Sequence, residues 1–206
     1  MDKIIVIDRC EEKHKSISVN DREALDYTVV CKSDAEREIN IGSKSNINLK
    51  IFVSGNASLN LRAYLNGEDS KIELREVFLA EGENIKLITR IIHVNKNNKS
   101  KMLVKGVLKG RSSVFFDGNI VIGKKASNSE GFQKSEVLIL GNNCEYKALP
   151  ELEIENQNVK CGHAATIGRI NKEMLFYLMS RGMSEKEAET EIVNGFLGDC
   201  LKDFVR

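Results

Sequence analysis

The 206-residue chain has no apolar run long enough to cross a membrane and no excess of charge of either sign. A transmembrane helix needs about 20 apolar residues, and the four that follow Lys3 are too few for a signal-peptide core. Lys and Arg number 31 against 30 Asp and Glu, for a net charge of +1, whereas proteins that grip phosphates need a basic face. We therefore expect a cytoplasmic protein that binds neither nucleic acid nor membrane.

The cysteines lack the spacing of a disulfide framework or a zinc finger. They are odd in number and scattered, with no C-x-x-C pair, and a cytosolic chain keeps its thiols reduced. We expect buried small hydrophobic residues, or one or two thiols with a chemical role, among Cys10, Cys31, Cys144, Cys161 and Cys200.

Common enzyme motifs are missing as well. The chain has no G-x-G-x-x-G, no Walker loop, no G-x-S-x-G and no H-E-x-x-H. Carboxylates are abundant, but none is visibly paired in an apolar setting. The sequence therefore favours a protein that is not an enzyme.

Before about residue 170, apolar and polar residues alternate in short segments such as 47–51, 59–61, 72–74, 85–87 and 152–154. A period of two is typical of strands with one buried face. The expected inward positions include Leu59, Leu61, Ile72, Leu74, Leu152 and Ile154.

Turns rich in glycine and asparagine separate these segments at uneven intervals. Irregular rungs of a β-solenoid have this pattern, and a β-sandwich with short hairpins fits the periodicity equally well. The many asparagines between Asn40 and Asn158 favour the solenoid, because asparagine tolerates left-handed corners. We expect parallel strands to stack from about Ile39 to Thr166, with residues 1–35 unassigned.

After residue 170 the period becomes helical. Asn171 can cap a first helix, Gly182 can end it, and Ser184 with Glu187 forms a capping box for a second. We expect a β-core over residues 1–170 and a helical hairpin over 171–206 that covers the exposed end of the sheet structure. The apolar stripes are Met174, Leu175, Leu178 and Met179, then Ala188, Ile192, Val193, Phe196, Leu197, Cys200 and Leu201.

Cys161 and His163 form the tightest chemical cluster. In a strand, residues two apart share a face at about 6.5–7 Å, so the pair could hold a soft or borderline metal, or His163 could lower the thiol pKa. The alternative is a buried cysteine beside a hydrogen-bonded histidine. Two ligands are too few for a stable metal site, so a second chain would supply the rest. Cys144 follows a turn, and core packing is its default role.

Several motifs in the second half of the chain occur together in a specific order. They are 110–113 (GRSS), 116–122 (FDGNIVI), 133–140 (QKSEVLIL), 150–154 (PELEI), 159–168 (VKCGHAATIG), 175–182 (LFYLMSRG) and 192–196 (IVNGF). The series resembles the SufB/SufD family of iron–sulfur cluster assembly proteins over residues 77–201, most strongly at 159–168.

This resemblance implies a mainly β fold, a right-handed parallel β-helix with a C-terminal helical hairpin. It also implies a cytosolic scaffold that works with a SufC-like ABC-type ATPase, which docks on the C-terminal helices. Family members pair through their β-helices, and a transient iron–sulfur cluster is thought to form at that interface. We therefore expect a homodimer through the region from Cys144 to Thr166.

Site residues follow from the same resemblance. Cys144 matches the scaffold thiol of the SufB branch, whereas Cys161 and His163 match the C-x-H of the SufD branch. A homodimer would combine the two halves as candidate cluster ligands. The residues expected to contact the ATPase lie on the helical hairpin: Arg181, Met183 and the corner containing Asn194 and Phe196.

The chain also departs from the family pattern. Ala164 follows His163 where the SufB branch usually has an acidic residue, and the chain is about half the usual length, without the N-terminal helical domain or a FAD signature. A minimal scaffold or an accessory subunit is the resulting interpretation. The alternatives are a metal-free interaction module and a left-handed β-helix acyltransferase, whose strict six-residue repeat is absent here.

Overall fold

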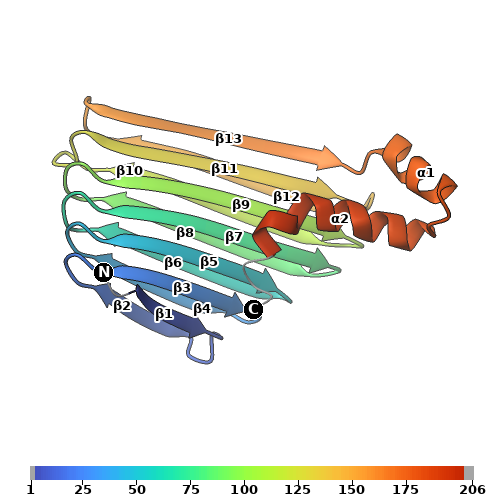
Figure 1. Ribbon diagram of the computed structural model, residues 1–206, viewed down its shortest axis with the longest axis horizontal. Helices are drawn as coiled ribbons and strands as arrows, with labels where there is room; N and C mark the ends of the chain where they lie inside the picture. The colour runs from blue at the N-terminus through green and yellow to red at the C-terminus, as the bar shows by residue number, and fades with distance from the viewer. Residues whose placement is uncertain (1–2, 202–206) are drawn as a thin grey trace.

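The computed structural model describes residues 3–201, and these form a two-sheet parallel β-solenoid followed by two helices (Figure 1). Odd-numbered strands make a seven-stranded sheet and even-numbered strands a six-stranded one, so each turn contributes one strand to each sheet. The strands are β1 (Lys3–Asp8), β2 (His14–Val19), β3 (Ala24–Cys31), β4 (Ala35–Ile41), β5 (Asn46–Ser54), β6 (Ala57–Leu65), β7 (Lys71–Glu81), β8 (Asn84–His93), β9 (Lys99–Lys109), β10 (Ser113–Ile122), β11 (Ser129–Ile139), β12 (Glu145–Ile154) and β13 (Val159–Arg169), and the helices are α1 (Lys172–Ser180) and α2 (Glu185–Leu201).

Neighbouring strands within each sheet pair in parallel. The expected parallel β-helix with a helical hairpin is confirmed, and the alternative of a sandwich built from antiparallel hairpins is wrong. Stacking begins earlier than expected, at Lys3 rather than near Ile39, because β1 to β4 occupy the segment that the sequence left unassigned. Tyr27, Val29 and Cys31 on β3 already alternate into the core.

The core lies between the two sheets and is filled by alternate side chains of each strand. Leu59, Leu61, Ile72 and Leu74 are buried there, as expected. Leu152 is half-buried against this core. The expectation for Ile154 is wrong, since its side chain is 47% exposed. Ile154 pairs with the buried Ile122, but β12 is the last strand of its sheet, so no described strand covers it.

Five corners on one side of the solenoid, from that between β2 and β3 to that between β10 and β11, use a residue in the left-handed conformation. These residues lead from an even strand to the next odd strand and stack on one another: Arg22, Lys44, Asp69, Asn97 and Asn128. Side-chain amides link the stack, because Nδ2 of Asn128 donates to Oδ1 of Asn97 and Nδ2 of Asn97 donates to Oδ1 of Asp69, each at 2.9 Å. The expected corner role of asparagine is confirmed at Asn97 and Asn128.

Glycine serves the opposite corner. Gly55, Gly82 and Gly110 follow β5, β7 and β9, and each has a positive φ, which costs glycine little because it has no Cβ. The three glycines are one solenoid turn apart. Gly67 belongs to the other corner, which explains why the glycines of the sequence are unevenly spaced.

The helix ends agree with their sequence signals. The Asn171 side chain caps α1, Gly182 has a positive φ after it, and Ser184 and Glu187 exchange capping-box hydrogen bonds. The stripe expected on α1 is not buried, however, since no residue of this helix is. No helix among the described residues is long and apolar enough to cross a membrane.

Helix α2 packs on the outer face of the odd sheet and leaves the end of the solenoid open, so the expectation that the hairpin covers this end is wrong (Figure 1). The reason is an outward-facing apolar patch on β7, β9 and β11. Val77, Val107 and Leu138 pack there against Leu197 and Cys200. Burying this patch stabilises the helix on the sheet by the hydrophobic effect.

Candidate functional site at the open end of the solenoid

The last turn of the solenoid exposes both its strand edges and part of its interior. Strands β12 and β13 each pair with a described neighbour on one side only. Inward-facing side chains of this turn are therefore accessible, as Ile167 illustrates at 55% exposure. Unpaired edges and exposed apolar side chains together indicate a surface suited to pairing with another chain.

Cys161 and His163 lie on the inward face of β13. They pair with Gly131 and Gln133 of β11, both of which are buried. Two residues apart on one strand, their Cα atoms are separated by about 6.6 Å. His163 is exposed and Cys161 is half-buried against the main core. The structure thus places the two sequence-predicted groups on the same face, at the open end.

The Cys161 thiol lies against Gly131 of the neighbouring strand β11. A Cβ at Gly131 would lie in ordinary contact with Cys161 Sγ, at 3.6 Å, but only 2.9 Å from Cγ2 of Ile120, so it is the Ile120 side chain that favours glycine beneath the thiol. Burial raises the pKa of Cys161. Because metals bind the thiolate, a metal at this position must displace the proton.

Cys144 lies at a different corner of the same turn. It precedes β12, is half-buried, and its Sγ is 3.4 Å from the carbonyl oxygen of Gly110. The ten residues of β12 span about 33 Å, and Cys161 is near the start of β13, beyond the far end of β12. One chain therefore does not bring Cys144 to Cys161 and His163, and the described residues contain no cluster of three or more His, Cys, Asp or Glu able to hold a metal.

The helical hairpin carries the second predicted surface. Arg181 and Met183 are exposed in the turn between the helices, and Asn194 is exposed on α2. The Arg181 guanidinium carbon lies 5.4 Å from the Tyr177 ring centroid. Large exposed apolar side chains surround this turn, namely Met174, Phe176, Tyr177, Met179 and Met183, a concentration typical of interaction sites.

Phe196 differs from its predicted setting. Residues 194–196 continue α2 rather than form a corner, and the Phe196 ring is half-buried against the sheet. Lys105 Nζ lies 4.9 Å from the ring centroid and donates to the Phe196 carbonyl at 3.0 Å. Phe196 therefore contributes to the docking of α2.

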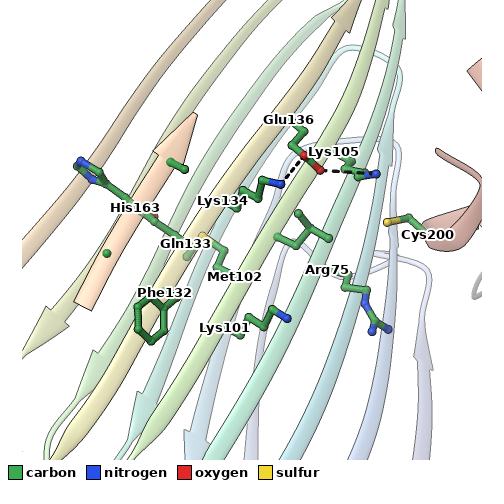
Figure 2. Close-up of a pocket in the computed structure, with 13 residues that line it drawn as sticks. Arg75, Lys101, Met102, Lys105, Phe132, Gln133, Lys134, Glu136, His163 and Cys200 are labelled. Atoms are coloured by element: carbon green, nitrogen blue, oxygen red, sulfur yellow. Dashed lines mark ion pairs between the residues drawn. The ribbon is translucent and has the colours of Figure 1, made fainter. Parts of the chain in front are cut away.

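A cavity of about 890 Å³ on the outer face of the odd sheet was missed by the sequence analysis (Figure 2). Basic side chains from three strands line it, together with Phe132 and, from α2, Cys200. The Glu136 carboxylate pairs with Lys134 at 2.6 Å and Lys105 at 3.6 Å. The backbone of His163 lines the cavity, whereas its ring points away from the other lining side chains (Figure 2). The alternating lysines at Lys99, Lys101 and Lys105 are the sequence signal for a basic outer face.

The architecture defines a class: a two-sheet parallel β-solenoid with a helical appendage and, among the described residues, unpaired strand edges at its last turn. Comparison with known proteins identifies the family. The family model described as "SUF system FeS cluster assembly, SufBD core domain" matches residues 17–196. The chain belongs to the SufBD family.

Individual relatives agree with this assignment. The chain is 35% identical over 138 residues to the iron–sulfur cluster assembly SufBD family protein ycf24 of Galdieria sulphuraria, covering 66% of this chain and 62% of the relative. It is also 35% identical over 138 residues to the iron–sulfur cluster assembly protein SufD of Bacillus subtilis, covering 32% of that protein. The matched segment thus spans less than two thirds of either relative.

Proposed function

We propose that the chain is a scaffold or accessory subunit of iron–sulfur cluster assembly that holds a nascent cluster as cargo at the open end of its solenoid. The observation that carries the proposal is that Cys161 and His163 lie on the same inward face of β13, at the open end, in a SufBD core domain. Thiolates are the chief ligands of iron–sulfur clusters, and imidazole replaces some of them.

A single chain offers too few ligands at one place, so the proposal includes a homodimer. Exposed strand edges at β12 and β13 favour pairing with a second copy, and twofold symmetry is the commonest arrangement. In this dimer the open ends face each other, and each buries the other's exposed Ile154 and Ile167.

Twofold symmetry also brings the separated ligands together. His163 is adjacent to Ala164, the middle residue of the eleven-residue β13. In this dimer the twofold axis passes through the middle of β13 and points toward the six-stranded sheet. Rotation about this axis places each corner of one copy's last turn against the opposite corner of the partner's last turn. Cys144 of one copy then lies on the same side of the axis as Cys161 of the other, and the two His163 residues lie near the axis between them, which gives two equivalent sets of three candidate ligands. A site with an incomplete ligand set suits a cluster that must be handed on.

Anaerobic reconstitution with iron and sulfide tests this site. We expect the unsubstituted chain to acquire sulfide-to-iron charge-transfer absorbance, and Cys144→Ala, Cys161→Ala and His163→Ala each to lose most of the bound iron and sulfide, because each removes one of three ligands. Cys200→Ala is the matched control, since Cys200 lies on α2 and is buried between this helix and the odd sheet. Retention of full iron and sulfide by all three variants would contradict the site and favour a metal-free interaction module.

The second part of the proposal is a partner ATPase of the ABC type that docks on the helical hairpin. The support is the exposed apolar surface around the α1–α2 turn. Arg181 adds an exposed positive charge to this surface. Phe196 supports the docking of α2 itself, so its contribution to partner binding is indirect.

A pull-down with the co-expressed ATPase tests this surface. We expect the double substitution Arg181→Ala and Met183→Ala to weaken binding at least tenfold while circular dichroism stays unchanged, because both side chains are exposed. Phe132→Ala is the control, since Phe132 is an exposed aromatic residue on the sheet. Equal recovery of the ATPase with the double variant and the control would refute the assignment.

A further inference from the structure

Two buried thiols meet at the amino-terminal end of the solenoid, far from the candidate cluster site. Cys10 follows β1 and Cys31 ends β3. Asp8 pairs with Val29 in the parallel register of these strands, so two residues further on Cys10 comes level with Cys31. A side-chain hydrogen bond joins the two thiols.

The register suits a covalent bond. Neighbouring strands are about 4.8 Å apart, and disulfides form when the Cα atoms are about 4.4–6.8 Å apart. Both cysteines are free, and they are packed in the same core cluster. Cys10 also has a φ of 54°, an uncommon conformation for a residue with a Cβ, which turns the chain back over the end of β3. We propose that Cys10 and Cys31 form a reversible disulfide that fastens the first turn of the solenoid.

The surroundings assign different roles to the two thiols. The hydrogen bond from Cys10 lowers the pKa of Cys31 more than burial raises it, and the nearby Arg37 guanidinium lowers it further. The same hydrogen bond and burial raise the pKa of Cys10. Cys31 is therefore the nucleophile and Cys10 the resolving thiol.

A peroxide is the oxidant that fits this enclosed pair. The Cys31 thiolate attacks one peroxide oxygen and the O–O bond breaks. Hydroxide departs, and Cys31 becomes a sulfenic acid. The Cys10 sulfur then attacks Cys31 Sγ, the S–O bond breaks, and water departs with the Cys10 proton. In total, two thiols and one hydrogen peroxide give one disulfide and two waters. Cys10 is 7% exposed and Cys31 is fully buried, so the proposed step requires the loop that connects β1 to β2 to open and admit the peroxide.

The proposed disulfide stabilises only the first turn of the solenoid. A bond between Cys10 and Cys31 closes a loop that contains β2, and closing a loop stabilises mainly by restricting the unfolded chain. Oxidation is therefore expected to raise the urea midpoint of unfolding and to slow proteolysis within the first turn.

The test treats the full chain with limiting hydrogen peroxide, followed by denaturation, alkylation and intact-mass measurement. We expect a loss of two hydrogens, alkylation of three of the five thiols, and a peptide that links Cys10 to Cys31. Dithiothreitol should restore five alkylations. Cys10→Ser and Cys31→Ser should each abolish the product, whereas Cys200→Ser should not.

Other outcomes would overturn the proposal. Five alkylated thiols after treatment, a link that joins other cysteines, or a Cys31 oxidised to sulfinic acid without a link each exclude the pair as a disulfide site. A urea midpoint that is lower in the oxidised chain would refute its fastening role. The unsubstituted chain alone decides these points, so a poorly folding serine variant does not affect them.

Discussion

Replacing Arg37 with alanine is expected to lower the free energy of unfolding by about 3–5 kcal/mol, since it removes the buried cation from a buried carboxylate and leaves only Lys15, whose Nζ lies 3.6 Å from Oδ2 of Asp8. The Arg37 side chain is 1% exposed and that of Asp8 5%. Arg37 Nε lies 2.8 Å from Oδ2 of Asp8, and Nη2 lies 3.1 Å from Oδ1. Arg37 also donates to the carbonyls of Glu12 and Lys13, which holds the loop between β1 and β2.

Urea unfolding at pH 7 measures this loss. Arg62→Ala is the control, because Arg62 is an exposed arginine on the neighbouring strand β6, where loss of a surface charge has a small effect. A loss below about 1 kcal/mol for Arg37→Ala would show that the buried pair does not hold the first turns together.

The same pair predicts an acid dependence. Burial of Asp8 opposes ionisation, but hydrogen bonds from Arg37 and Tyr27 outweigh it and lower the pKa of Asp8 to about 2. A lowered carboxyl pKa adds stability that is present above the ordinary value near 3.8 and is lost as pH falls toward 2. In Arg37→Ala this loss between pH 4 and pH 2 should become smaller, because only the hydrogen bonds from Tyr27 and from the Cys10 backbone remain to lower the pKa of Asp8.

Replacing Glu76 with glutamine is expected to stabilise the protein at pH 8 by up to about 3 kcal/mol and to have little effect at pH 5. Glu76 is fully buried between the sheets, and burial raises its pKa from 4.5 to about 7, although Thr89 Oγ1 donates to its Oε2 at 3.0 Å. Between these two values the folded state holds a proton that the unfolded state releases. Stability is therefore lost as pH rises from about 4.5 to 7.

His93 acts in the opposite direction. Burial lowers the pKa of His93 to about 4, so unfolding takes up a proton below about pH 6.5 and stability falls with falling pH. The two dependences offset each other in the unsubstituted chain between pH 4.5 and 6.5. Glu76→Gln should uncover the His93 dependence, measured as urea midpoints from pH 4 to 8.

A substitution near the surface provides the control for this experiment. Glu81→Gln changes an exposed carboxylate at the end of the same strand and should leave the pH profile unchanged. A Glu76→Gln profile parallel to that of the unsubstituted chain would show that folding does not shift the pKa of Glu76.

The strands of the middle turns could be predicted because their inward residues are aliphatic and alternate strictly, as at Leu59, Leu61, Ile72 and Leu74. The first turns could not, since Arg22 and Lys44 adopt the left-handed corner conformation and neither residue type signals it. The repeat of the solenoid turn was also difficult to recognise in the sequence because each repeat is long. Each turn has two corners of different composition, and only the structure separates the Gly55 corner from the Gly67 corner.

The helices and the site show the same limit. Caps at Asn171 and Ser184 are local and could be predicted, whereas the docking of α2 depends on Val77, Val107 and Leu138 meeting on one outer face, which requires the strand register. Spacing alone placed Cys161 and His163 on one face. The distance of Cys144 from them depends on the length of β12 and could not be predicted before the turn was known.

The most direct test of the shared cluster site is complementation between two inactive variants. Cys144→Ala and His163→Ala chains are mixed, allowed to exchange subunits, and reconstituted anaerobically. In a twofold dimer, half of the mixed population is heterodimeric and each heterodimer has one intact site, so iron binding should recover to about a quarter of the unsubstituted level. A mixture of Cys161→Ala and His163→Ala should not recover, because both changes fall in the same half of the site. No recovery in the first mixture, or equal recovery in both, would contradict a cluster site built from two copies.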